Sequence, residues 1–323
     1  MLTRSRKSWE MPESRATPES VFRRRRVLAA GLAAGPLLLG ASRLLPMSEA
    51  GAEDAPIAPE RYPAPRNEAY QLDRPLTAED LVTTYNNFYE FGSHKQISRA
   101  AQALPLRPWE VRIDGLVEEP VTMDAEELIR KLPLEERLYR LRCVEAWSIT
   151  VPWTGFPLRA LVDMARPLGS ARYLKMTTFM DPSAAPGQRQ FWYPWPYVEG
   201  LTIAEATNEL AFIATGAYGK PMPKQNGAPL RLAVPWKYGF KSVKSIVAFE
   251  FTEERPENFW QTIQASEYGF WANVNPEVPH PRWSQATEKV LATGEQVPTL
   301  LYNGYGEQVA GLYSGLDSEP LFM

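Results

Sequence analysis

The sequence predicts an α+β fold made of many short strands and a few short helices. Segments that alternate apolar and polar residues, such as 109–113 and 137–143, recur along the chain and are typical of half-buried strands. Helical signals are short, as at 124–132. Gly, Pro, Asn and Asp separate these segments, and no internal repeat is evident. Short elements of both kinds place the chain in the α+β class.

Residues 1–52 are predicted to be an export signal. Residues 1–22 are polar and lack an apolar period, which predicts disorder. Arg23 to Arg26 then precede a short, Gly-containing apolar run that is too short for a membrane span. Arg24-Arg25-x-Val27-Leu28 fits a twin-arginine signal, and Ala50-Gly51-Ala52 offers a cleavage site. An uncleaved N-terminal anchor is the alternative.

Residues 53–75 are proline-rich, which predicts an extended arm lying on the main domain, residues 76–323. Within that domain, Thr77-Ala78-Glu79-Asp80 favours the start of a short helix. Residues 109–113 and 120–123 lie on either side of an Asp-Gly turn, which predicts a β-hairpin.

Two further helices and three further strands follow from the patterns of the remaining chain. Asp124 and Glu127 resemble a capping pair and predict a helix with its apolar residues on one side. A second short helix is predicted at 158–164. Strands are expected at 172–179, 230–234 and 242–251. The C-terminal third is rich in loops.

A long loop at 182–196 carries an aromatic cluster. Its members are Phe191, Trp192, Tyr193 and Trp195. Most such clusters are structural, but one beside a cleft lines a substrate entrance. The sequence leaves both interpretations open.

The charge balance argues against nucleic-acid binding. The whole chain carries 35 basic and 38 acidic residues, and residues 1–52 hold nine and four of them. The remaining 271 residues therefore carry 26 basic and 34 acidic side chains, a net charge of −8. A protein that binds nucleic acid needs a basic face, so we expect no nucleic-acid partner.

Cys143 is the only cysteine in 323 residues, so it cannot form an internal disulfide. Residues 137–142 alternate as a strand does. Pro152, Gly155 and Pro157 are predicted to break regular structure after it. Cys143 is therefore expected where a strand runs out into a loop, a common position for reactive groups.

The chemistry of Cys143 depends on its ionisation. Arg140 and Arg142 are expected to favour the thiolate, the form that attacks a substrate or binds a metal. A buried, inert cysteine is the alternative. One Cys and two His, His94 and His280, do not supply a zinc ligand set. A Cys–His nucleophilic pair is conceivable, but a structural role in a loop is favoured for His280.

A group of basic residues follows in a chain that is acidic overall: Arg231, Lys237, Lys241 and Lys244. They form either a solvated face or a pocket for a dianionic phosphate. Neither a phosphate-binding loop nor a dinucleotide fingerprint occurs in the sequence.

Several sequence blocks, in order, are similar to those of one known family. They are Tyr85-Asn86-Asn87-Phe88-Tyr89-Glu90-Phe91-Gly92, Arg142-Cys143-Val144-Glu145-Ala146-Trp147-Ser148, Gln225-Asn226-Gly227-Ala228-Pro229, Val234-Pro235-Trp236-Lys237-Tyr238-Gly239-Phe240-Lys241 and Asn273-Val274-Asn275-Pro276. Together they resemble the sulfite-oxidase-type molybdopterin oxidoreductases, and more closely the catalytic subunits of periplasmic protein-methionine-sulfoxide reductases. The blocks span nearly all of the chain after the signal.

The resemblance implies a sulfite-oxidase-type fold, with mixed sheets, short helices and many loops, and makes 76–323 a molybdopterin-binding catalytic domain. It implies one pterin per molybdenum and Cys143 as the thiolate ligand of the metal. The matching cofactor-binding positions are Asn86, Tyr89, Glu90, Cys143, Thr178, Asn226, Arg231, Ser242, Val243 and Lys244. Tyr89, Glu90 and the segment 242–244 are expected to bind through backbone groups.

Glu145 is the second catalytic candidate, because it matches an acidic residue that faces the metal in this family. A partly desolvated site near negative ligands is expected to favour its protonated form, which suits a proton donor. The alternative is that Glu145 pairs with Arg140 or Arg142 and orders the loop.

The function implied by the resemblance is reduction of methionine sulfoxide in periplasmic proteins. A haem-containing membrane subunit is the implied electron donor. Twin-arginine export carries folded proteins, which fits a cofactor inserted before the protein reaches the periplasm. Two alternatives stay open: a sulfite dehydrogenase with the same ligation, and an exported binding protein without enzymatic activity.

Overall fold

The computed structural model describes residues 55–72 and 74–323. The signal predicted at 1–52 lies outside the described residues. The α-helices are α2 (Glu79–Thr84), α3 (Ser98–Ala101), α4 (Ala125–Lys131), α5 (Leu158–Ala165), α6 (Ile203–Ala206), α7 (Phe259–Gln264) and α8 (Gly306–Val309). In the described part of the chain, no helix has both the length and the apolar character that a membrane span needs.

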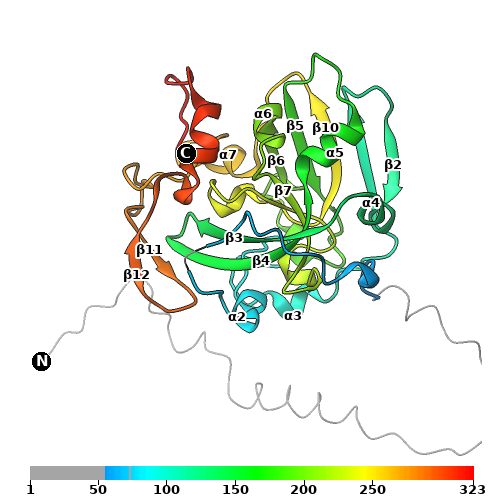
Figure 1. The fold of residues 1–323 in the computed structure, drawn as a ribbon, viewed down its shortest axis with the longest axis horizontal. Coiled ribbons are helices and arrows are strands. Elements are labelled where there is room, and N and C mark those ends of the chain that lie inside the picture. Colours follow the sequence, from blue (N-terminus) through cyan, green and yellow to red (C-terminus); the bar gives the residue numbers. More distant parts are fainter. Residues whose placement is uncertain (1–54, 73) are drawn as a thin grey trace, which may run out of the picture. The chain divides into compact units, whose positions relative to one another are not determined.

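The strands form two mixed sheets (Figure 1). They are β1 (Glu110–Gly115), β2 (Val121–Asp124), β3 (Glu135–Cys143), β4 (Trp147–Pro157), β5 (Tyr173–Thr178), β6 (Val198–Thr202), β7 (Phe212–Ala217), β8 (Lys220–Pro221), β9 (Arg231–Ala233), β10 (Ile246–Thr252), β11 (Thr287–Val290) and β12 (Gln296–Pro298). The predicted α+β class, with mixed sheets and short helices, is confirmed.

The first sheet has the strand order β2-β1-β10-β5-β6. Its β1 and β10 strands are parallel, and every other neighbouring pair is antiparallel. The predicted hairpin is confirmed, since Val111 of β1 lies opposite Met123 of β2. The strand expected at 242–251 starts only at Ile246, because Gly239–Lys241 form a 3-10 turn and Ser245 adopts a left-handed φ of 50°.

The second sheet has the order β12-β11-β4-β7-β8, with β3 paired to β4 and β9 paired to β7. The long β3–β4 hairpin crosses the middle of Figure 1, above the labels of α2 and α3. The prediction that Pro152 breaks regular structure is wrong, whereas the β4–β7 register shifts between Thr154 and Gly155, and Pro157 ends β4 as expected. Pro152 lies opposite Leu138 inside the hairpin, and its carbonyl accepts the Tyr218 N–H at 3.0 Å. Gly155 permits close approach to β7, since a Cβ there would lie 2.0 Å from the Ile213 carbonyl oxygen.

The predicted helices are present at 79–84, 125–131 and 158–165. Asp124 caps α4, because its carboxylate accepts the Glu126 N–H at 2.8 Å. The expected partner Glu127 instead forms an ion pair with Lys131, one helical turn away.

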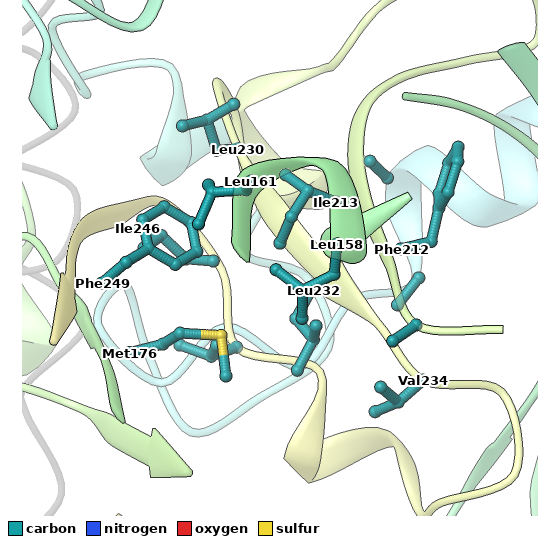
Figure 2. Packing of buried hydrophobic residues seen from close by; sticks show 14 of the residues in the cluster. Leu158, Leu161, Met176, Phe212, Ile213, Leu230, Leu232, Val234, Ile246 and Phe249 are labelled. Atoms are coloured by element: carbon teal, nitrogen blue, oxygen red, sulfur yellow. The ribbon is translucent and has the colours of Figure 1, made fainter. Parts of the chain in front are cut away.

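Side chains from both sheets share one hydrophobic core with helix α5 (Figure 2). Leu158 and Leu161 of α5 pack in the same cluster as Phe249 of β10 and Ile213 of β7, and all four are fully buried. Burying a side chain of this size contributes about 1.5–3 kcal/mol. The shared core therefore fixes the two sheets relative to each other.

The described part of the proline-rich arm contacts helix α4 and strands β3 and β7. The Asn67 N–H donates to the Glu136 carbonyl at 2.8 Å, and the Tyr62 hydroxyl donates to Thr215 Oγ1 at 2.7 Å. Arg61 donates to the carbonyl of Arg130 at 2.8 Å. The arm is thus attached by hydrogen bonds as well as by packing.

Candidate active site

Cys143 is the last residue of β3 and faces Trp147, the first residue of β4. The Ala146 N–H donates to the Cys143 carbonyl at 3.0 Å, and Ala146 adopts a left-handed φ of 64°. A three-residue turn therefore follows the thiol directly. The prediction that Cys143 stands where a strand runs out into a loop is confirmed.

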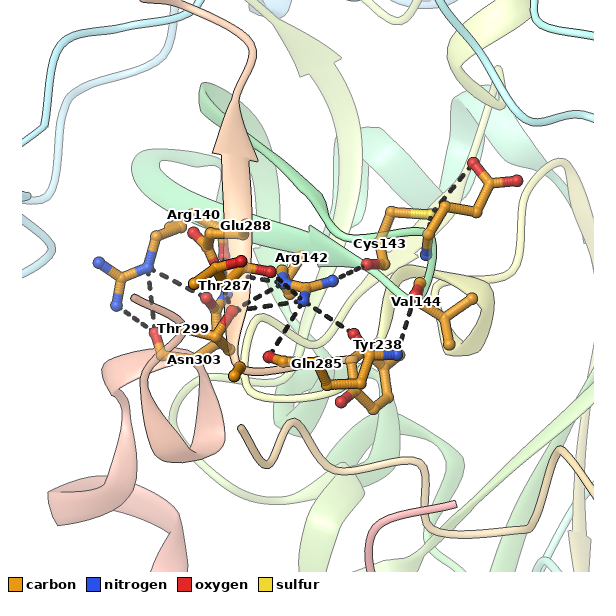
Figure 3. A network of polar contacts seen from close by, with 12 residues as sticks. Arg140, Arg142, Cys143, Val144, Tyr238, Gln285, Thr287, Glu288, Thr299 and Asn303 are labelled. Atoms are coloured by element: carbon orange, nitrogen blue, oxygen red, sulfur yellow. Dashed lines mark hydrogen bonds and ion pairs between the residues drawn. The ribbon is translucent and has the colours of Figure 1, made fainter. Parts of the chain in front are cut away.

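The end of β3 is held in place by a buried polar network around Arg142 (Figure 3). Arg142 Nε lies 3.0 Å from Glu288 Oε2, and both side chains are almost completely buried. Its Nη2 donates to Gln285 Oε1 at 2.8 Å, and its Nη1 donates to the Cys143 carbonyl. Removing one partner of a buried ion pair is strongly destabilising. The network thus fixes the position of the Cys143 backbone.

A cavity of about 460 Å³ opens in front of Cys143. Ten of the eleven predicted site residues line it: Asn86, Tyr89, Glu90, Cys143, Glu145, Asn226, Arg231, Ser242, Val243 and Lys244. The eleventh, Thr178, is not among the lining residues. Its side chain is buried and donates to the Phe179 carbonyl at 3.3 Å. Thr178 instead contacts the side chain of Glu90, which lines the cavity, and its role in cofactor binding stays a prediction.

Polar side chains surround the thiol on the cavity side. The Nδ2 atom of Asn87 lies 3.6 Å from Cys143 Sγ, and Glu145 Oε2 lies 3.7 Å from it. Lys95 Nζ lies 2.6 Å from Glu145 Oε2 and 2.5 Å from Asn87 Oδ1. Trp147 Nε1 donates to Glu145 Oε2 at 2.9 Å. The Lys95 ammonium group thus positions both polar neighbours of Cys143 Sγ, which are Asn87 and Glu145.

Burial raises the pKa of the Cys143 thiol to about 12, and the Glu145 carboxylate adds to the rise. Lys95 and Arg142 act in the opposite direction, but less strongly. Arg142 thus favours the thiolate as expected, but burial outweighs it, so the predicted thiolate is wrong for this arrangement. Arg142 faces Glu288, and Arg140 Nε donates to the Asn303 carbonyl at 3.1 Å. A metal cation that displaces the proton is what makes such a thiol a ligand.

Glu145 is ionised in this arrangement. Burial tends to raise its pKa, but hydrogen bonds from Lys95, Trp147 and Asn87 outweigh burial and hold the pKa below its usual range. The described residues thus favour the carboxylate form of Glu145, and its role as a proton donor stays a prediction. The pairing with Arg140 or Arg142 is wrong, because the partner is Lys95.

The basic residues at 231–244 do not form a solvated face, and two of them form internal ion pairs. Lys237 Nζ lies 2.5 Å from Glu205 Oε1, and Lys241 Nζ lies 2.6 Å from Glu199 Oε2. All four side chains are almost completely buried. Neither lysine lines the cavity.

Four cationic side chains line the cavity: Arg142, Arg231, Lys244 and Arg282. Arg142 forms an ion pair with Glu288, and Arg282 forms one with Glu267. Among the described residues, Lys244 makes no hydrogen bond or ion pair, and Arg231 donates only to carbonyl groups, such as that of Asn226 at 3.1 Å. Burial and the neighbouring Arg231 lower the pKa of Lys244 to about 7, and burial lowers that of Arg231 to about 10. A Cβ at Gly227 would come within 2.8 Å of Lys244. The wall thus presents positive charge that a bound anion would stabilise.

Two buried amides supply unused acceptors. Asn86 and Asn226 both donate Nδ2 to the Val82 carbonyl, at 2.8 and 3.1 Å. Their Oδ1 atoms are buried and have no hydrogen-bond partner within the described part of the chain. An unsatisfied buried acceptor costs about 1–3 kcal/mol. A ligand with N–H donors in the cavity would remove that penalty.

Sequence reasoning missed several residues of the site. Lys95 and Trp260 are the most important, because one contacts Glu145 and the other lines the cavity. Asn87 lay inside a matching block, which was a usable signal. No sequence pattern indicated Lys95, because it contacts Glu145 only in the folded chain. Neither His94 nor His280 lines the cavity, and His280 stacks on Trp283 with 3.7 Å between the ring centroids.

Comparison with known proteins agrees with this geometry. A family model described as "Oxidoreductase molybdopterin binding domain" matches residues 98–260. The fold and the cavity thus define an oxidoreductase of the molybdopterin-binding class. A solved chain of the sulfane dehydrogenase SoxCD from Paracoccus pantotrophus matches with a TM-score of 0.40 and 18% identity, over 48% of this chain and 41% of that chain.

Two relatives are similar over almost their whole length. Both are described as "Protein-methionine-sulfoxide reductase catalytic subunit MsrP". The one from Xanthomonas axonopodis pv. citri is 47% identical, and the one from Xanthomonas campestris pv. campestris is 46% identical. Each match covers 98% of this chain and 99% of the relative. The chain belongs to the family of protein-methionine-sulfoxide reductase catalytic subunits.

The residues of the cavity fit a molybdopterin. A thiolate is a suitable soft ligand for the metal, and Cys143 is the only thiol of the chain. Arg231 and Lys244 suit the phosphate, because each brings positive charge and neither forms an ion pair with a carboxylate of residues 55–72 or 74–323. The free acceptors of Asn86 and Asn226 suit the N–H groups of the pterin.

Proposed function

We propose that this protein reduces methionine sulfoxide residues of other proteins to methionine at the Cys143 cavity. The observation that carries the proposal is that the only thiol of the chain shares one cavity with nine other predicted site residues. The length-wide identity of 47% to a sulfoxide reductase subunit supports it. The reaction consumes two electrons and two protons and yields a thioether and water.

We assign different residues of the cavity to the metal, the phosphate and the pterin ring of the cofactor. When bound, a molybdenum-bearing pterin supplies two-electron chemistry and oxygen transfer. Cys143 would hold the metal, Arg231 and Lys244 would hold the phosphate, and Asn86 and Asn226 would hold the pterin ring. We assign one pterin per molybdenum, since 460 Å³ lies in the range of a pocket for one ligand of that size.

The mouth of the cavity suits a substrate that is part of another protein. The Glu145 side chain keeps 34% of its surface exposed although it lies 3.7 Å from Cys143 Sγ. Arg282 also lines the cavity and is exposed. A methionine sulfoxide side chain that projects from a protein surface therefore needs no lid to open before it enters.

The proposal includes an external electron donor and a periplasmic location. One cysteine is too few for an iron–sulfur cluster or a c-type haem within these 323 residues. A haem-containing membrane subunit is the donor we propose. Oxidised periplasmic proteins are the proposed substrates. The twin-arginine pattern at residues 24–28 is the proposed signal for export.

The test uses protein purified from a molybdenum-replete host. Metal analysis should find about one molybdenum per chain, and a dye reductant should drive reduction of a methionine sulfoxide peptide. Sulfite oxidation is measured in parallel. Turnover of sulfite without turnover of the sulfoxide would support a sulfite dehydrogenase instead. Protein without molybdenum that turns over neither substrate would support a binding protein.

A further inference from the structure

The loop between β5 and β6 exposes two adjacent aromatic side chains. Phe191 is 90% exposed and Trp192 is 61% exposed. Within residues 55–72 and 74–323, five other large hydrophobic side chains are exposed, none aromatic and none above 51%. An aromatic side chain buries about 150–250 Å² when it is covered. Two of them side by side in water are therefore a candidate contact for a partner.

The exposed pair is connected to the cavity by a series of ring contacts. The Phe191 and Trp192 centroids are 5.2 Å apart, and Trp192 lies 6.2 Å from Tyr193. Tyr193 in turn lies 6.3 Å from Tyr89 and 6.5 Å from Trp260, which both line the cavity. An apolar track thus runs from the cavity wall to the exposed pair.

The length of this track matches a few residues of polypeptide. Two ring-to-ring steps separate Trp260 from Trp192, and about four residues of extended chain span them at roughly 3.3–3.6 Å per residue. A chain whose sulfoxide enters the cavity would therefore reach Trp192 with a neighbouring side chain.

We propose that Phe191 and Trp192 form a docking site for an apolar side chain of the substrate, about four residues from the methionine sulfoxide. This inference rests on the proposed function and narrows its substrate class. Preferred substrates are unpaired segments of protein that carry an aromatic or large aliphatic residue at that distance. The occupant is the substrate chain because the track leads into the cavity.

The test compares three substrates: N-acetyl-methionine-sulfoxide amide, a peptide with Trp four residues from the sulfoxide, and the same peptide with Ser in place of Trp. In the Phe191→Ser/Trp192→Ser variant, kcat/KM for the Trp peptide should fall about tenfold or more. The values for the amide and the Ser peptide should change less than twofold. Leu168→Ser, which removes another exposed apolar side chain, is the matched control and should change none of the three.

Each other outcome overturns the inference. Equal values for Trp and Ser peptides in the parent protein would show that no such site operates. An equal fall for all three substrates would show damage to the cavity. Unchanged peptide kinetics with lost binding to lipid vesicles, or with a dimer converted to monomer, would assign the pair to a membrane or to a second copy. Lack of turnover of the amide by the parent would instead defeat the proposed function.

Discussion

Lys95 and Glu145 lie 50 positions apart in the sequence, and the Lys95 ammonium group lies 2.6 Å from the Glu145 carboxylate beside the only thiol of the chain. The same ammonium group contacts Asn87, whose amide lies 3.6 Å from Cys143 Sγ. A single cation therefore organises both polar neighbours of the sulfur. Its removal should affect the geometry of the cavity more than the stability of the fold.

We expect Lys95→Met to lower turnover of methionine sulfoxide at least about tenfold, because small misplacements near a reacting centre have large effects on rate. Molybdenum content should stay within twofold of the parent. Lys95→Arg should restore part of the rate. Lys220→Met, which breaks the exposed ion pair with Glu79, is the control and should leave the rate unchanged. Parental turnover in Lys95→Met would show that Asn87 and Glu145 do not need this cation.

Cys143→Ala should abolish turnover while the fold survives. The removed sulfur is small and lies at the end of a strand, so the melting temperature should change by only a few degrees. Turnover, molybdenum content and thermal unfolding are measured on the same preparation. A variant that keeps both its molybdenum and the parental rate would refute Cys143 as the ligand.

Arg231→Ala should lower cofactor occupancy rather than the rate per bound molybdenum. A lost charge-assisted contact contributes about 1.5–3 kcal/mol, which corresponds to roughly 10–150-fold in affinity. Arg231→Lys keeps the charge and should lose less. Arg255→Ala, which removes an exposed pair with Glu319, serves as the control. Equal molybdenum in Arg231→Ala and the parent would exclude a contact between Arg231 and the cofactor.

Tyr62→Phe should change the alkaline stability of the protein. Burial raises the pKa of Tyr62 to about 12, against an ordinary value of 10.0. The folded state therefore favours the neutral phenol, whose contribution is complete below pH 10 and is lost as the pH rises through 12. The variant loses the hydrogen bond to Thr215, about 1 kcal/mol at pH 8, and its stability should fall less steeply between pH 10 and 12. The free energy of unfolding in urea is measured for the variant and the parent across this pH range. Equal slopes against pH would contradict a raised pKa for Tyr62.

Replacing Arg24 and Arg25 together by Lys should strand the precursor in the cytoplasm with its signal attached. The arginine pair is recognised by a receptor, so charge alone does not substitute for it. Cell fractionation and mass spectrometry of the N-terminus measure the outcome. A normal periplasmic yield would show that another route carries the protein.

Local patterns predicted much of the fold, because they depend on neighbouring residues. Alternation identified the hairpin of β1 and β2, and Asp124 identified the start of α4. The failures arose where tertiary contacts outweigh local preference. Pro152 remains inside a strand because β3 and β7 flank it on both sides, and Lys237 is buried because Glu205 neutralises it.

The candidate site was predictable through the resemblance and not through physical patterns alone. No periodicity relates Asn86 to Asn226, although both donate to the Val82 carbonyl. Ionisation was the least predictable property. Sequence proximity suggested that Arg142 controls Cys143, but strand alternation turns the two side chains to opposite faces, and burial then dominates the pKa of the thiol.

The residues that line the cavity come from segments of the chain that are synthesised at very different times. Asn86 emerges early, Cys143 near the middle and Trp283 close to the end of synthesis, yet all three face the same space. Glu288, which fixes the backbone of Cys143 through Arg142, emerges later still. A nascent chain that ends before Glu288 therefore lacks part of the residues that form and support the cavity. We therefore expect the cofactor to bind only after residue 288 has been synthesised.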